Sequence, residues 1–510
     1  MPSFQPKQFV LVLSLLLLAS CAGRAQEADL ARFTILYTSD THGHVVSDKS
    51  TIGLDQVAGV KKALEPSLLL DSGDFSDGTP MAVLDKGESM VGLMKKAGYF
   101  ATALGNHEFT YGRTVLEQRI AQASQSPGSM GILSANVMKS NGALLVPASA
   151  RTTVAGVNIC VYGLTTQETR TQTTPSAVAD LDFLDPVPVS RRMTRELRAS
   201  GCEVIVALAH VGNDVHVDLK SVAIAEATPG LDIMVDGHCH MEFEKRTGSG
   251  ALVVSPGALG KKLGRLDLAY DRKQGTIVSI ANTLLAPEDI AAFTPDAALT
   301  EEIAALEKKT ETELATPVGE SLYALDGSRS AVRTRETNLG NLSADSLRAA
   351  HGADFALLNG GSIRDSIRKG PVTGKDILAV YPFTSNVISY QATGAEVREM
   401  LEHGLSFLPG EGGGFPQVSG MIVHIKADAP KGQRVKKLLL PSGKPVEMEK
   451  TYTIAVNNFI AEGGDGYTTF TGKTRYKEFS SPQEALENYL QLVGTKKYAP
   501  GPATRLIFQR

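Results

Sequence analysis

Thr38-Ser39-Asp40-Thr41-His42-Gly43 follows directly on the apolar run 33–37, and this junction decides the fold of the first half of the chain. A short apolar run with β-branched residues predicts a buried strand. Four further runs have the same form, at 68–70, 101–104, 204–208 and 233–235, and Asp, Asn or His residues follow each of them. In α/β architectures, ligands collect just beyond the carboxyl ends of strands. The first half is therefore expected to be an α/β domain with a binding site at these strand ends.

The polar residues that follow the five runs have the chemistry of metal ligands. They are Asp40, His42, Asp74, Asn106, His107, His210, His238 and His240. Imidazoles and carboxylates without dominant thiolates favour two divalent metal ions of the kind Zn, Mn, Co or Fe. A carboxylate that bridges two such ions holds them about 3.5–4 Å apart, and a water between them becomes hydroxide near neutral pH. We expect a two-metal hydrolase in which Asp74 is the bridge and His107, beside Asn106, faces the leaving group.

The residue pattern of these motifs resembles that of a known family. Asp-x-His-Gly, Gly-Asp-x-x-x-Gly, Gly-Asn-His-Glu and Gly-His-x-His are similar to the calcineurin-like metallophosphatases, and Leu104-Gly105-Asn106-His107-Glu108-Phe109 resembles their 5′-nucleotidase branch. The resemblance implies one metal held by Asp40, His42, Asp74 and His240. It implies a second metal held by Asp74, Asn106, His210 and His238. His107 would then lie over the leaving oxygen.

One catalytic position departs from the family pattern. Many members have Asp three residues after the catalytic His, where it orients the imidazole, and this chain has Thr110. A hydroxyl can hold a tautomer but supplies no charge, so we expect a weaker acid role for His107. Related enzymes that cleave cyclic nucleotides or 3′-nucleotides can carry a neutral residue here, which keeps that substrate class open.

The second half resembles the C-terminal domain of the same family through three phrases, at 333–340, 358–364 and 458–467. The resemblance implies that Phe383 and Phe459 sandwich the base and that Asp465 accepts hydrogen bonds from ribose hydroxyls. Phosphate would be held by Arg333 and Arg364, with Arg329 as a weaker match, and Asn359 would contact the nucleotide. Aromatic stacking suits any nucleobase, and Arg forks suit phosphate oxygens.

The amino terminus predicts export. Residues 9–18 are apolar but too short to span a bilayer as a helix. Leu18-Ala19-Ser20-Cys21 resembles the lipobox of bacterial lipoproteins, which implies cleavage before Cys21 and lipidation of that residue. An ordinary signal peptide cut after Ala25 is the alternative. The expected parts are a lipoprotein signal peptide (1–20), a tether (21–30), a metallophosphatase domain (31–285), a connecting segment with a helix (286–317) and a substrate-binding domain (318–510).

Two local features refine this division. Thr294 is expected to cap the connecting helix, with Pro295 at its first position. Of the cysteines other than Cys21, Cys160 and Cys202 are expected to be buried thiols, because three cysteines do not make a disulfide framework. Cys239, between two ligand histidines, is expected to point away from the metals.

Composition limits the partners. A net charge of −4 and a pI near 6.2 offer no field that attracts nucleic acid. A membrane is expected to be reached only through the lipid at Cys21, and the sequence carries no signal for an oligomeric state.

The whole pattern predicts a two-domain α/β protein: a metallophosphatase β-sandwich flanked by helices, and an α/β domain that binds the nucleotide. The expected activity is hydrolysis of nucleoside 5′-phosphates outside the cytoplasm, in the periplasm or at the cell surface. Two alternatives stay open. The chain could prefer 2′,3′-cyclic nucleotides, 3′-nucleotides or UDP-sugars, or it could be a non-catalytic nucleotide-binding lipoprotein.

Overall fold

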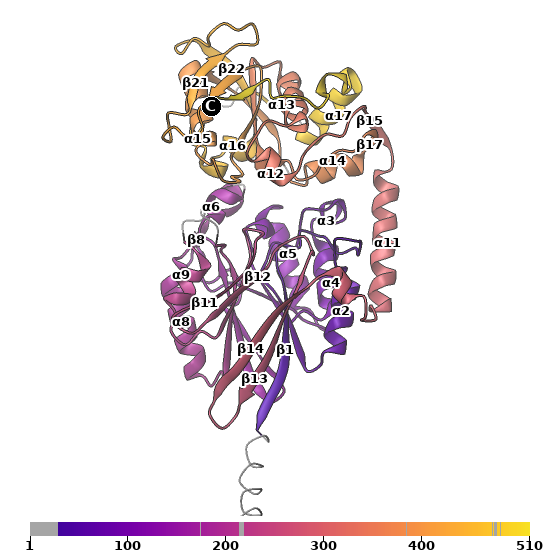
Figure 1. The fold of residues 1–510 in the computed structure, drawn as a ribbon, viewed down its shortest axis with the longest axis vertical. Coiled ribbons are helices and arrows are strands. Elements are labelled where there is room, and N and C mark those ends of the chain that lie inside the picture. Colours follow the sequence, from indigo (N-terminus) through magenta and orange to yellow (C-terminus); the bar gives the residue numbers. More distant parts are fainter. Residues whose placement is uncertain are drawn as a thin grey trace, which may run out of the picture.

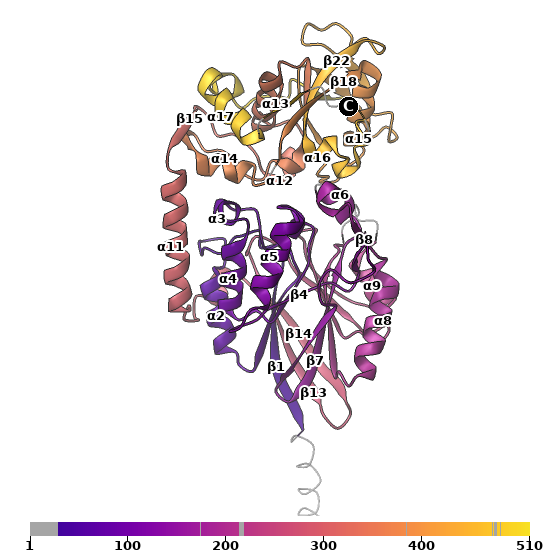
Figure 2. The same cartoon turned by 180° about the vertical axis from the view of Figure 1, so that it is seen from behind.

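A computed structural model describes residues 29–509 except 174, 214–218, 384, 472, 474–476 and 480. The expected signal peptide, Cys21 and most of the tether lie outside the described residues. Figure 1 shows two domains stacked along the long axis, with one long helix beside them, and Figure 2 shows the same arrangement from behind.

The first domain contains two six-stranded sheets. The first sheet has the order β14 (Thr276–Leu285), β13 (Leu263–Asp271), β1 (Leu30–Thr38), β2 (Ser67–Asp71), β3 (Ala101–Ala103) and β4 (Gly131–Leu133). The second has the order β11 (Glu242–Arg246), β12 (Leu252–Pro256), β10 (Ile233–Asp236), β9 (Val204–His210), β7 (Val157–Thr165) and β6 (Ser149–Val154). All five apolar runs are therefore strands, and they are divided between the two sheets.

The sheets pack face to face, and helices cover their outer sides. Apolar side chains of β1, β2, β7, β9 and β10 form one buried core between the sheets. A second core joins the first sheet to α2 (Leu54–Ala63), α4 (Glu88–Ala97) and α5 (Arg113–Ser124). A third joins the second sheet to α8 (Pro186–Ala199) and α9 (Ser221–Glu226). The predicted β-sandwich flanked by helices is confirmed.

Short elements connect the strands at the end of the sandwich that faces the second domain. They are α3 (Pro80–Leu84), η1 (His107–Phe109), β5 (Val137–Lys139), α6 (Thr169–Gln172), α7 (Pro175–Val178) and β8 (Leu181–Phe183). After β14 the chain forms α10 (Pro287–Ile290). The long helix α11 (Ala297–Leu314) then runs along the side of the first domain and reaches the second domain at its end.

The predicted connecting helix exists, but it begins two residues later than expected. Its N-cap is Asp296, whose carboxylate accepts a hydrogen bond from the backbone N–H of Leu299. A carboxylate is a stronger acceptor for this N–H than the hydroxyl of Thr294. Leu299 and Ile303 pack into the core of the first domain, and the same helix contacts α14 (Gly374–Val380) of the second domain. The helix therefore both packs on the first domain and joins the two.

The second domain is built on a five-stranded sheet with the order β19 (Pro416–Ser419), β16 (Phe355–Asn359), β22 (Thr451–Asn457), β18 (Val387–Thr393) and β23 (Lys477–Phe479). One face packs against α13 (Asn338–His351) and α17 (Pro482–Val493). The other face packs against α15 (Gly394–Leu405) and a small sheet of β21 (Val435–Leu439), β20 (Ile422–Ile425) and β24 (Leu506–Phe508).

Smaller elements of this domain turn toward the first domain or close its edge. They are β15 (Pro317–Ser321), α12 (Arg329–Val332), η2 (Gly360–Ser362), β17 (Gly370–Thr373), α16 (Asn458–Ala461), η3 (Gly464–Gly466) and η4 (Lys496–Tyr498). Contacts between short elements join the domains directly: α6 meets η3, and α3 meets α14. The ends of several loops from each domain therefore face one another.

The cysteines differ from the sequence interpretation. Cys160 on β7 and Cys202 before β9 form a disulfide, with their Cα atoms 5.8 Å apart. The expectation of two free thiols was wrong because the parallel pairing of β7 with β9 brings together residues 42 positions apart, which the count of cysteines does not reveal. Within the described ranges, no helix has the length and apolarity needed to cross a bilayer.

Candidate metal and phosphate site

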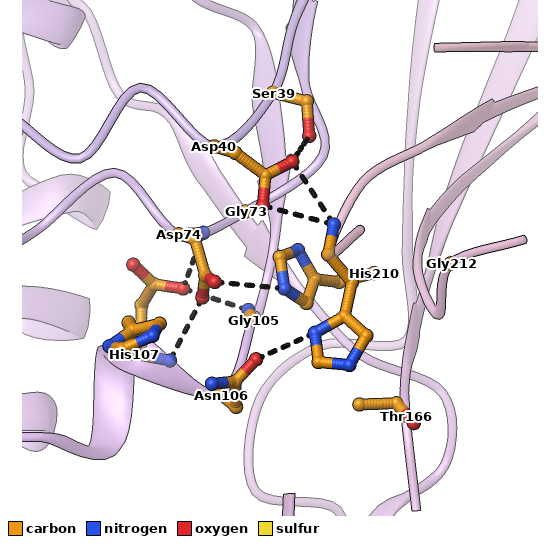
Figure 3. A network of polar contacts seen from close by, with 12 residues as sticks. Ser39, Asp40, Gly73, Asp74, Gly105, Asn106, His107, Thr166, His210 and Gly212 are labelled. Carbon is orange, nitrogen blue, oxygen red and sulfur yellow. Dashed lines mark hydrogen bonds and ion pairs between the residues drawn. The ribbon is translucent and has the colours of Figure 1, made fainter. Parts of the chain in front are cut away.

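The structure brings the seven predicted metal ligands together at the carboxyl ends of strands from both sheets. Nitrogen and oxygen atoms of Asp40, His42 and His240 lie within 4.8 Å of one another, and so do those of Asp74, His210 and His238. Asn106 joins the second group, because its Oδ1 lies 3.0 Å from Nδ1 of His238. Figure 3 shows Asp74 between His210 and the loop that carries Asn106 and His107.

The histidine tautomers fit metal binding. Nδ1 of His210 donates to the carbonyl oxygen of Ser72 at 2.8 Å, so the neutral ring keeps its lone pair on Nε2. That Nε2 is buried and lies 3.0 Å from a carboxylate oxygen of Asp74, where two electron-rich atoms would repel one another. A cation between them, either a proton on Nε2 or a metal ion, resolves this conflict. Without metal, Asp74 outweighs burial and raises the pKa of His210 to about 10. An outward N–H bond of this kind is typical of metal-binding histidines.

His42 repeats the arrangement in the other group. Its Nδ1 donates to Asp77 at 3.0 Å, and its Nε2 lies 3.2 Å from Nε2 of His240. Oδ1 of Asp40 is 3.6 Å from that same nitrogen of His240. The donor set of each group therefore fits a divalent ion that accepts nitrogen and carboxylate ligands.

The backbone at these ligands is unusual. Residues other than glycine seldom have positive φ. Five of the seven ligands have it: Asp40, His42, Asp74, His238 and His240. Such conformations cost about 1–3 kcal/mol each and persist where the surroundings hold them. They aim successive side chains of one loop at a common point.

Two glycines allow the loops to approach closely. A Cβ at Gly105 would lie 2.1 Å from a carboxylate oxygen of Asp74, and one at Gly237 would lie 2.2 Å from Oγ of Ser39. Both distances are shorter than any non-bonded contact, so any side chain there would displace Asp74 or the loop of Asp40.

The side chain of Glu108 ties the two loops of the second group together. One oxygen accepts the backbone N–H groups of Asp74 at 3.0 Å and Gly105 at 2.8 Å. The other accepts those of Phe75 and Ser76 and the hydroxyl of Ser76. A carboxylate that is 5% exposed and accepts five hydrogen bonds fixes the backbone of the loops that carry Asp74 and Asn106.

His107 has a carboxylate partner that the sequence analysis missed. Its Nδ1 donates to Oδ2 of Asp77 at 2.8 Å, while Thr110 donates its hydroxyl to the same oxygen at 3.0 Å. Burial alone would lower the pKa of His107, but Asp77 and Asp74 outweigh burial and raise it. The expectation that His107 lacks a charged partner was wrong, since Asp77 comes from the loop after β2 and not from position 110.

The second domain supplies the opposite wall of a shared cavity. All seven predicted substrate-binding residues line it, together with His107, Thr110 and the exposed edges of Asp74, Asn106, His238 and His240: Arg329, Arg333, Asn359, Arg364, Phe383, Phe459 and Asp465. Asp40, His42 and His210 are buried beneath this surface. Cys239 also lines the cavity, so the expectation that it points away from the site is not supported by its position.

The arginines form a cationic cluster above the metal ligands. Burial and the charge of Arg364 lower the pKa of Arg329 to about 10. Burial and the two neighbouring arginines hold the pKa of Arg333 well below its usual value. Nε of Arg333 is buried and has no hydrogen-bond partner among the described residues. Three guanidinium groups that repel one another and leave a donor unused fit a polyanionic ligand such as phosphate.

Phe383 shows how the two domains meet, and Asp465 is held by a contact within the second domain. The ring of Phe383 stacks on His107, with centroids 5.2 Å apart, and Arg364 lies 5.3 Å from the centre of the same ring. Asp465 has φ of 51°, and its carboxylate accepts a hydrogen bond from Asn359 at 2.8 Å. Burial raises the pKa of Asp465 despite this bond.

Several cavity residues carry no motif that sequence reasoning could use. Phe407 contributes another aromatic ring, and the glycines at 412 and 414 lie against it so closely that a Cβ on either would clash with the ring. Glu168 lies 3.5 Å from Nε2 of His238. The run of three glycines was a visible signal for a close approach, but its partner was not.

Comparison with known proteins identifies both domains. The family model for calcineurin-like phosphoesterases matches residues 33–242, and that for the 5′-nucleotidase C-terminal domain matches residues 314–472. Protein UshA of Escherichia coli is 30% identical over 93% of this chain and 94% of its own length. The 5′-nucleotidase of Vibrio cholerae is 30% identical over 96% of this chain and 97% of its own.

Other relatives extend the comparison. The trifunctional nucleotide phosphoesterase protein YfkN of Bacillus subtilis is 31% identical over 86% of this chain, which spans only 32% of that longer protein. Among solved structures, a 5′-nucleotidase precursor from Thermus thermophilus superimposes with a TM-score of 0.81 at 28% identity, over 94% of this chain and 99% of that one. The chain is therefore a metal-dependent phosphoesterase and belongs to the bacterial 5′-nucleotidase family, with a calcineurin-like N-terminal domain and a 5′-nucleotidase C-terminal domain.

Proposed function

We propose that this chain hydrolyses nucleoside 5′-phosphates to a nucleoside and phosphate. One observation carries the proposal: a single cavity is lined on one side by metal-ligand chemistry and His107, and on the other by three arginines, aromatic rings and Asp465. A phosphate monoester with a nucleoside attached has matching parts in the same order. The names of the relatives, two of which are called 5′-nucleotidase, agree with this substrate class.

The residues would divide the reaction as follows. Asp40, His42, Asp74 and His240 would hold one divalent ion, and Asp74, Asn106, His210 and His238 a second. Such ions polarise a phosphoryl oxygen and activate water. Arg333 and Arg364, with Arg329 beside them, neutralise charge on the phosphate as it is transferred. His107, whose Nδ1 is already used, gives the proton on Nε2 to the departing ribose oxygen.

The nucleoside would be held by the second domain. Phe459 and Phe383 offer flat faces for the base, a contribution of about 1–3 kcal/mol for each stacked base. Asp465 and Asn359 would take up ribose hydroxyls. Because Phe383 also stacks on His107, and because the cavity lies between domains, substrate entry and product release would need the domains to rotate apart.

We further propose that the protein works outside the cytoplasm, anchored through a lipid at Cys21. The disulfide between Cys160 and Cys202 supports an oxidising compartment, where such bonds persist. The apolar leader with its lipobox-like end supports the anchor. The limits 31–285 and 318–510 for the two domains belong to the same proposal, and β14 ends at Leu285 while β15 begins at Pro317.

A substrate panel tests the activity. AMP, UMP, ATP, UDP-glucose, 3′-AMP and 2′,3′-cyclic AMP are each offered with Zn, Mn, Co or Fe, and phosphate release is measured, after coupling to a phosphatase for the diesters. The proposal expects kcat/KM to be highest for the 5′-monophosphates. Preference for cyclic or 3′-nucleotides, or for UDP-glucose, would replace it with the corresponding activity. Tight nucleotide binding without turnover under every metal would indicate a binding protein.

A further inference from the structure

We propose that Asp77 is a positioning residue that joins the two halves of the catalytic site: one carboxylate oxygen orients a metal-binding imidazole, His42, and the other orients the imidazole at the leaving group, His107. This inference rests on the proposed function in the role it gives to His107. Neither the motif set nor the family pattern in the sequence assigned a role to this residue.

The geometry is that of a bridge. Oδ1 of Asp77 accepts the N–H of His42 Nδ1 at 3.0 Å, and Oδ2 accepts that of His107 Nδ1 at 2.8 Å. The two rings stand edge to face with their centroids 4.9 Å apart. The carboxyl group is completely buried, so water does not compete for either oxygen.

The bridge fixes the orientation of both rings and the hydrogen that each of them carries on Nδ1. An ionised carboxylate has no hydrogen to donate, so each imidazole must place a hydrogen on Nδ1. The remaining nitrogen, Nε2, then carries the lone pair of His42 toward the ligands Asp74 and His240. In the imidazolium form of His107, Nε2 carries the second proton, which is the one that the leaving oxygen needs. A single side chain thereby sets the metal end and the acid end of the site.

Thr110 cannot replace Asp77 in this arrangement. Its hydroxyl lies 3.4 Å from Nδ1 of His107, farther than Asp77, and it donates to Oδ2 of Asp77. Thr110 therefore holds the carboxylate that holds the histidine. The carboxylate that the family pattern leads us to expect at position 110 is supplied here by Asp77 from the loop after β2, which in addition reaches a metal ligand.

The test uses one single and one double variant. In Asp77→Asn the amide oxygen can accept one N–H, but the NH2 group cannot accept the other, so one imidazole loses its partner. Asp77→Asn with Thr110→Asp returns a carboxylate beside His107 only. Asp85→Asn, near the end of α3 and outside the cavity, is the matched control.

Two readouts separate the two ends of the bridge. Metal affinity, measured by calorimetry or by competition with a chromophoric chelator, is expected to fall about 10–100-fold in Asp77→Asn, as is usual when the partner of a ligand histidine is removed. At saturating metal, kcat for phenyl phosphate is expected to fall about 100-fold, and kcat for 4-nitrophenyl phosphate less than about tenfold, because only the poor leaving group needs a proton.

The double variant gives the decisive comparison. It should restore kcat on phenyl phosphate while metal affinity stays low, and Asp85→Asn should change neither. If metal affinity and both rates fall in equal proportion, and the double variant restores none of them, Asp77 only supports its loop. Unchanged metal affinity would overturn the link to His42. Because aryl phosphates replace nucleotides here, failure of the nucleotide panel would overturn the proposed substrate without affecting this result.

Discussion

Replacing Glu108 by Gln should destabilise the first domain and loosen its metal ligands. Each carboxylate oxygen of Glu108 accepts at least two hydrogen bonds, and four of the five donors are backbone N–H groups. The NH2 group of Gln must take the place of one oxygen. At least two buried donors then lose their acceptor and point at the NH2 group, which is itself a donor. An unsatisfied buried donor costs about 1–3 kcal/mol, so the expected loss is about 4 kcal/mol.

This loss is large enough to measure by thermal unfolding. In a domain of this size, 1 kcal/mol shifts Tm by about 2–4 °C, so the transition of the first domain should move down by about 8–16 °C. The matched control is Glu117→Gln, because Glu117 is 55% exposed in its pair with Arg113 on α5. Exposed pairs contribute about 0.3–0.5 kcal/mol, and the control should shift Tm by less than about 2 °C.

Metal binding gives the second half of the assay. Since Glu108 holds the backbone of Asp74 and of Gly105, next to Asn106, the variant should also bind metal more weakly, so that added metal raises its Tm less than that of the parent. Equal Tm shifts in Glu108→Gln and Glu117→Gln would refute the reasoning. So would a large fall in Tm with unchanged metal affinity, because the carboxylate would then stabilise the domain without positioning the ligands.

Three further predictions address the disulfide, the base site and the pH profile. Reduction of Cys160–Cys202 should destabilise the first domain by about 4 kcal/mol from the entropy of a loop of this length, measured as a reductant-dependent Tm that the Cys160→Ser, Cys202→Ser double variant lacks. Phe459→Ala should raise KM for AMP and leave the hydrolysis of 4-nitrophenyl phosphate nearly unaffected. Phe383→Ala removes the ring that stacks on His107 and should slow the hydrolysis of both substrates. Equal effects of the two variants would contradict separate roles. Because Asp77 raises the pKa of His107 against the opposing effect of burial, the protonated acid should be lost only as pH rises through the raised value. The alkaline limb of the kcat profile should therefore lie high and move down in Asp77→Asn, and an unmoved limb would show that another group controls it.

The parts of the site that sequence predicts are those written in single short segments. Each metal ligand follows an apolar run, so the strand and its ligand are recognised together. In the same way, η1 carries His107 and Glu108 directly after Asn106, within one short segment. Local pattern also places Phe383, Phe459 and Asp465 in one cavity once the family is recognised. The local pattern does not reveal that β1 and β9 belong to different sheets, because the sequence of an apolar run does not show which strand pairs with it.

The residues that were missed act between segments. Asp77 is three positions from a metal ligand and looks like an ordinary polar loop residue, and only the folding of that loop against η1 puts its carboxylate between two imidazoles. The disulfide has the same origin, because it depends on which strands are neighbours. A departure from a family motif is therefore weak evidence of lost chemistry. At position 110 the carboxylate is absent from the expected place in the sequence, and the fold brings the carboxylate of Asp77 to Nδ1 of His107 from another loop.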